Sequence, residues 1–209
     1  MRAASVAICE DEKRAAQFWL AEMMLSLGKR EKALPIIDSI ISEFGPDSSN
    51  RAFIDGLILR WRITKTNADF QLARDAVKGA GESRPRHHFG GVLIDEGKYA
   101  EAEDILAADI ETGDTVAQML LTDARIRSGN ADSARQLFLR TQRDQISSQY
   151  QYPYAVTACQ VALSCRDEEI RGLAILSLSE ILPTSPEEEK HVKDLLLSLQ
   201  SDSHWGKLS

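Results

Sequence analysis

Apolar residues recur three or four positions apart along almost the whole chain, while the strict alternation typical of surface strands is nearly missing. This spacing places apolar side chains on one face of an α-helix and therefore predicts helices. A first helix is expected over residues 14–27 and to end at Gly28, because glycine is common just after the last helical turn. A second helix follows at once and ends before Gly45 and Pro46. The predicted unit is two antiparallel helices joined by a tight turn.

This helix pair recurs along the chain, and each copy is marked by a glycine followed five residues later by an alanine. The marker pairs are Gly28 with Ala33, Gly97 with Ala102, and Gly129 with Ala134. The first two glycines lie 69 residues apart and the last two lie 32 apart, so the longer gap holds two units of about 34 residues. A degenerate copy with Ala73 fills that gap, with about three residues inserted before its turn.

In the third copy Phe89-Gly90 is followed by a Gly97-Lys98-Tyr99 turn and then by Ala102 with Leu106. This order resembles the tetratricopeptide repeat family, which has a Leu-Gly pair, a Gly-x-Tyr turn and an Ala-x-x-x-Phe pair at these places. The resemblance implies an all-α fold, an α-solenoid of about five antiparallel helix pairs with a C-terminal capping helix. It implies a single domain over residues 1–200, with repeats at residues 10–46, 50–81, 84–113, 115–143 and 149–183.

Small residues are expected where two helices cross, because close approach requires a short side chain at the crossing. We therefore expect four alanines to lie under bulky side chains of the preceding helix, namely Ala33, Ala73, Ala102 and Ala134. In the less regular fifth pair, Gly172 and Ser179 are the candidates for this role.

A last helix is expected over residues 185–200. Ser185, Pro186 and Glu188 are typical of a helix start, as the N-cap, the first helical residue and the capping-box residue. The apolar residues fall on one face, as expected of a helix that caps a repeat array; they are Val192, Leu195, Leu196 and Leu199. Residues 201–209 are expected to form a mobile tail. Residues 3–8 either extend the first helix or belong to an upstream element, in which case the chain is the C-terminal part of a longer protein.

Composition and charge narrow the possible roles. The formal net charge of −7 argues against nucleic-acid binding, because phosphate contacts need clustered lysine and arginine. No apolar run is long enough to span a membrane. Cys9, Cys159 and Cys165 cannot all pair with one another and lack the spacing of a zinc site, so they are expected to be reduced. The expected location is the cytoplasm.

The sequence contains none of the common catalytic or nucleotide-binding motifs, so we expect neither an enzyme nor a bound cofactor. His87 and His88 are adjacent, but neighbouring side chains on a helix point about 100° apart and do not share a metal ion well. No metal site is therefore predicted.

These observations together predict a protein that binds another protein or peptide. In the tetratricopeptide family the first helix of each pair lines a concave surface, which implies lining positions at Phe18, Glu22, Leu59, Arg62, His87, Gly91, Ile94, Met119, Asp123 and Arg127. Residues 84–88 are the densest run of cationic side chains and favour an acidic peptide. The predicted partner-binding residues are Arg62, Arg84, Arg86, His87, His88, Asp123 and Arg127.

Two alternatives stay open at this point. The tyrosines of residues 150–154 form an aromatic cluster, which either binds the partner or packs the entry to the fifth pair. The chain is alternatively a regulatory or sensor repeat domain of a larger effector or enzyme. The chaperone-tail groove of the family is not reproduced, because Phe18 and Glu22 occupy the places of its carboxylate-binding side chains.

Overall fold

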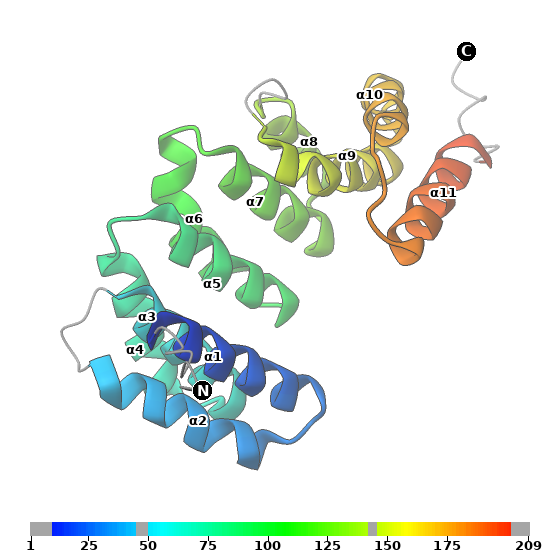
Figure 1. The fold of residues 1–209 in the computed structure, drawn as a ribbon. Helices are drawn as coiled ribbons and strands as arrows, with labels where there is room; N and C mark the ends of the chain where they lie inside the picture. Colours follow the sequence, from blue (N-terminus) through cyan, green and yellow to red (C-terminus); the bar gives the residue numbers. More distant parts are fainter. Residues whose placement is uncertain (1–9, 45–49, 142–145, 202–209) are drawn as a thin grey trace, which may run out of the picture. The chain divides into compact units, whose positions relative to one another are not determined.

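A computed structural model of the chain describes residues 10–44, 50–141 and 146–201, and every regular element in these ranges is a helix (Figure 1). The all-helical fold predicted from the apolar spacing is thus confirmed for this part of the chain. No helix in it is long and apolar enough to cross a membrane. The α-helices are α1 Glu10–Ser26, α2 Arg30–Phe44, α3 Arg51–Thr64, α4 Asn67–Gly79, α5 Ser83–Asp95, α6 Tyr99–Glu111, α7 Thr115–Arg127, α8 Ala131–Phe138, α9 Gln151–Cys165, α10 Glu168–Ser179 and α11 Pro186–Ser201, and a 3₁₀ turn, η2 Ser148–Tyr150, precedes α9.

The chain divides into two compact units, residues 1–89 and 90–209, and the boundary falls inside α5. In the first unit α1 packs against α2, α2 against α3 and α3 against α4, and α1 also contacts α3. The core between these helices includes Ala21, Ile37 and Leu59. A second set of aromatic rings joins α3, α4 and the start of α5, where Trp61 lies 5.3 Å from Phe70 and 5.5 Å from Phe89 between ring centroids.

In the second unit consecutive helices from α6 to α11 also pack against one another, and both α7 and α11 contact α9. Helix α9 lies at the centre of this core, with Ala155, Ala158 and Cys159 fully buried. Burial raises the pKa of the Cys159 thiol to about 11, so this cysteine is held in its neutral form. The ring of Phe138 from α8 stacks on Tyr154 at 5.2 Å.

A left-handed residue lies in each turn that joins α1 to α2, α3 to α4, α5 to α6, α7 to α8, and α9 to α10. The residues are Gly28, Lys65, Gly97, Gly129 and Arg166, with φ between 53° and 80°. At Gly97 the left-handed conformation lets the next amide, that of Lys98, donate to the Leu93 carbonyl at 2.8 Å and close the end of α5. The glycines predicted to end the first helices do so, and the other two turns use non-glycine residues at the same place.

The spacing from the left-handed residue to the buried alanine takes two values, which differ by three residues. After a glycine, the buried alanine is the fourth residue of the next helix, as Ala33 is in α2 and Ala102 in α6. After Lys65 or Arg166, it is the seventh residue, as Ala73 is in α4 and Ala174 in α10. Residues three apart lie on the same side of a helix, so both turns bring an alanine to the same face. The second copy thus has three additional residues, as predicted, but they follow the left-handed Lys65 and extend the start of α4 instead of preceding the turn.

The four alanines predicted at helix crossings are all fully buried, with no exposed surface at Ala33, Ala73, Ala102 or Ala134. The prediction for the fifth pair was wrong, because Gly172 and Ser179 are exposed on the outer side of α10. Ala174 takes this place with 0% exposure, and Leu178 follows it at 1%. The left-handed residue Arg166 determines where α10 begins and therefore which of its residues face the core. Because this residue is not a glycine, the glycine pattern does not predict its conformation.

Gly90 in α5 makes the closest helix contact of the second unit among the glycines described. A Cβ atom at this position would lie 2.9 Å from both Cγ and Cδ2 of Leu106 in α6. Leu106 is fully buried. The absence of a side chain at Gly90 is thus what allows α5 and α6 to pack around Leu106.

Helix α11 begins as predicted, since Ser185 Oγ accepts a hydrogen bond from the Glu188 amide at 3.1 Å. The Glu188 carboxylate accepts from the amide and the hydroxyl of Thr184, each at 2.7 Å. On the core side Val192 is 7% exposed and Leu199 is fully buried. The predicted apolar face therefore covers the core of the second unit, with Leu195 and Leu196 at its margin.

The predicted segments outside the described residues are residues 1–9, the ends of the first and fourth repeats, and residues 202–209 of the tail. The single domain predicted for residues 1–200 stays a prediction.

Candidate functional site

A groove in the second unit lies between α7 and α9 and has a volume of about 510 Å³. We call it the α7–α9 groove. Its apolar lining comes from Val116, Met119, Leu120, Pro153 and Val156. Polar side chains surround this lining; they are Asp123, Arg127, Tyr150, Tyr152, Thr157, Gln160 and His191. The volume is within the range of pockets that hold small ligands or parts of a peptide.

One end of the α7–α9 groove carries an arginine shared between two carboxylates. Arg127 Nε lies 3.0 Å from Asp123 and Arg127 Nη1 lies 3.1 Å from Asp95. Burial lowers the pKa of Arg127, but the hydrogen bonds and negative charges of Asp123 and Asp95 outweigh it and raise the pKa overall. Because two carboxylates surround one guanidinium, this end of the groove carries a net negative charge.

The other end is formed by Tyr152 of α9 and His191 of α11. The Tyr152 hydroxyl lies 2.5 Å from Nδ1 of His191, and the two rings meet edge to face at 6.1 Å between centroids. Burial and the nearby Glu188 carboxylate raise the pKa of Tyr152, so its hydroxyl keeps its proton. The terminal helix thus closes this end of the groove.

Inside the groove, two polar side chains differ in what they can offer a ligand. The hydroxyl of Thr157 donates to the Pro153 carbonyl at 2.9 Å and keeps its acceptor lone pairs. The half-buried carboxamide of Gln160 has no hydrogen bond to another side chain or carbonyl in the described part of the chain. A carboxamide in this setting can donate to and accept from the backbone of an extended peptide.

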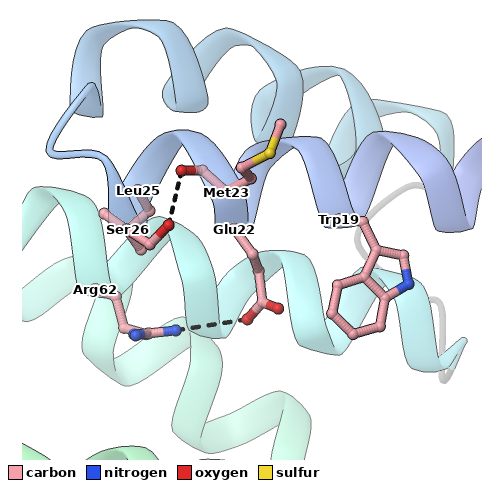
Figure 2. Close-up of a pocket in the computed structure, with 6 residues that line it drawn as sticks. All are labelled: Trp19, Glu22, Met23, Leu25, Ser26 and Arg62. Carbon is pink, nitrogen blue, oxygen red and sulfur yellow. Dashed lines mark hydrogen bonds and ion pairs between the residues drawn. The ribbon is translucent and has the colours of Figure 1, made fainter.

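A second pocket, of about 430 Å³, lies in the first unit between α1 and α3. Figure 2 shows Glu22 between the indole of Trp19 and the guanidinium of Arg62. We call it the α1–α3 pocket; Met23, Leu25 and Ser26 complete its lining.

The structure divides the predicted partner-binding residues between the two units. Asp123 and Arg127 line the α7–α9 groove together with Tyr150 and Tyr152 of the tyrosine cluster that the sequence offered as an alternative. Tyr154 is 3% exposed and packs in the core of the second unit instead. Arg62 lies in the α1–α3 pocket, where it pairs with Glu22 at 3.6 Å. The partner-binding role of these residues stays a prediction.

The four remaining predicted residues lie in the first two turns of α5, and two of them, Arg86 and His88, make contacts within the first unit. Arg86 Nη1 donates to the Ala80 carbonyl at 2.8 Å. His88 Nδ1 lies 2.8 Å from Asp55, a carboxylate that Arg51 also approaches at 3.4 Å. His87 is half-buried and Arg84 is exposed. The cationic segment is therefore partly used to hold α5 in place.

Among the predicted concave positions, Glu22, Arg62, Met119, Asp123 and Arg127 line one of the two pockets. The prediction for Leu59 and Ile94 was wrong, because they are 0% and 2% exposed and belong to the cores. Sequence reasoning did not include Trp19, Gln160 or His191. Trp19 lies three residues before Glu22, and this helical spacing is the signal in the sequence that points to it. The place of His191 depends on how α11 packs, and no local sequence pattern reveals that.

Comparison with protein-family models, with curated proteins and with solved structures gives no match to this chain.

Proposed function

We propose that this chain is a non-enzymatic interaction scaffold that holds a segment of a partner protein in the α7–α9 groove. In the same proposal, the helices form a tetratricopeptide-like solenoid of five pairs capped by α11. The regular order of left-handed turn and buried alanine supports this arrangement. The cytoplasmic location stays a prediction from the sequence.

The observation that carries the proposal is an apolar lining framed by polar groups between two first helices, α7 and α9. Leu120 and Val156 are half-buried and offer apolar surface from opposite sides. Tyr150 and Gln160 offer hydrogen bonds for a peptide backbone. Such a combination suits an extended segment with apolar side chains, because the side chains gain from burial while the backbone keeps its polar partners.

The groove also limits the charge of its partner. Arg127 already pairs with Asp123 and Asp95, so an acidic side chain would have to displace a carboxylate to reach it. A neutral, apolar segment meets no such competition. The acidic partner suggested by residues 84–88 is therefore not assigned to this groove.

Site-specific photo-crosslinking tests the proposal. We place benzoylphenylalanine at Leu120 in the groove and, as a matched control, at Leu176 on α10, which is 48% exposed outside it. A partner recovered from the native host should crosslink at Leu120 and not at Leu176.

The recovered partner is then used in a binding titration. Leu120→Ser should raise its Kd about tenfold or more, because a buried leucine contributes about 1.5–3 kcal/mol. Leu176→Ser should leave the Kd unchanged. Crosslinking at Leu176 alone, or equal affinity of both variants, would show that the α7–α9 groove is not the interface.

A further inference from the structure

Trp19 of the α1–α3 pocket has 69% of its surface exposed, whereas Trp61 in the core of the same unit has 2%. Tryptophan is on average one of the more buried residues, because its large apolar ring gains much from burial. Tryptophan is enriched at binding interfaces, so an exposed ring beside a pocket is a candidate contact for a ligand. Met23, at the same pocket, is also 51% exposed.

Glu22 lies one helical turn after Trp19, so both side chains leave α1 on the same side (Figure 2). Its ion pair with Arg62 is long, 3.6 Å between Oε1 and Nη1, and the two side chains are 30% and 33% exposed. A carboxylate offers about four lone-pair sites, and this contact reaches only one oxygen. Glu22 can therefore accept a further cationic donor without being uncovered first.

We propose that the α1–α3 pocket binds an arginine side chain of an extended partner segment. The guanidinium stacks on the exposed face of Trp19 while its N–H groups donate to the Glu22 carboxylate. Arginine fits better than lysine, because its planar group can stack and form a bidentate contact at the same time. The pocket volume of about 430 Å³ leaves room for the whole side chain.

An acidic side chain would be repelled at the same place. The face of the indole ring carries the negative part of its quadrupole and repels a carboxylate. Reaching Arg62 would require breaking its pair with Glu22, which would then repel the incoming acid. The net charge of −7 further attracts cationic segments and repels anionic ones.

This site lies in the first unit and shares no residue with the α7–α9 groove. The inference therefore does not rest on the proposed function, and each can fail while the other holds.

The probe is a capped tripeptide, acetyl-Gly-Arg-Gly-amide, titrated into ¹⁵N-labelled protein at low salt. The indole N–H resonance of Trp19 is identified by its loss in Trp19→Ala, and its shift reports binding even at millimolar affinity. The arginine peptide should shift it in a saturable way. The same peptide with citrulline, which is neutral and of the same shape, and the same peptide with glutamate should bind about tenfold more weakly or not at all. Free arginine amide should bind no more tightly than the peptide.

Matched variants distinguish binding in the pocket from attraction by the overall negative charge of the protein. Glu22→Gln should weaken binding about tenfold or more, whereas Glu31→Gln, which removes the same charge from the exposed surface of α2, should change it little. Arg62→Gln should leave binding equal or tighter, because it removes the competing cation. Binding of citrulline equal to arginine, absence of a Trp19 shift, or a larger loss in Arg62→Gln than in Glu22→Gln overturns the proposal.

Discussion

Replacing Gly90 by alanine sets two effects of known size against each other. Alanine in a helix is favoured over glycine by about 1 kcal/mol, through backbone entropy. Against this, the new methyl group would lie 2.9 Å from Cγ and Cδ2 and 3.0 Å from Cδ1 of Leu106, so the whole end of that side chain has to move. Leu106 is fully buried, so its side chain can move only against other residues of the core.

Overpacking of this kind costs about 1–3 kcal/mol. The net effect of Gly90→Ala should be a loss of about 0–2 kcal/mol in the free energy of unfolding, after the gain in helix propensity. Gly91→Ala is the matched control, because it lies in the same helix and its Cβ would meet Leu120 at an ordinary 3.8 Å. That variant should gain up to about 1 kcal/mol.

The assay is urea unfolding followed by far-ultraviolet circular dichroism, with both variants compared in the same transition. The control should exceed the Gly90→Ala variant in stability by about 1–3 kcal/mol, with the same dependence on urea. Equal stability of the two variants would refute the reasoning, since it would mean that Leu106 moves aside at no cost.

Three further predictions concern other contacts. Ala102→Leu should destabilise the protein by about 1–3 kcal/mol through overpacking, and an unchanged melting temperature would contradict its place at a helix crossing. Deletion of everything after Pro183 removes α11 and should cause aggregation by exposing the core of the second unit; a monomer of normal stability in light scattering would exclude the capping role. Burial raises the pKa values of Asp69 and Asp167, but hydrogen bonds and a neighbouring arginine outweigh it and lower both below the ordinary pKa of an aspartate. Their contribution to stability is complete above the ordinary aspartate pKa and should be lost as the pH falls through the lowered pKa values, and Asp167→Asn should reduce this acid sensitivity.

Local rules were enough to predict most of the helices. Glycine at positions 28, 97 and 129 ends a helix because it adopts the left-handed conformation without strain, and that property is visible in the sequence. Lys65 and Arg166 adopt the same conformation, but nothing in their residue type predicts it. For this reason the second copy needed an insertion and the fifth pair was given the wrong small residues.

The candidate site was predictable only in part. Asp123 and Arg127 were placed correctly on a first helix because helical spacing is a local property. That Tyr152 would meet His191 across the groove depends on how α11 packs on α9, which is set by residues 39 positions apart. Likewise, a run of cationic residues does not reveal that Arg86 is bound to the carbonyl of Ala80.

The two spacings between the left-handed residue and the buried alanine imply which insertions and deletions this chain can tolerate during evolution. Adding three residues at the start of a second helix, as after Lys65 compared with Gly97, keeps the alanine on the same face. Adding one or two would rotate it by about 100° or 200° and bring a different side chain to the crossing. Length variation among descendants of this sequence should therefore occur at these turns in steps of one helical turn, and reading such steps would align copies that share almost no residues.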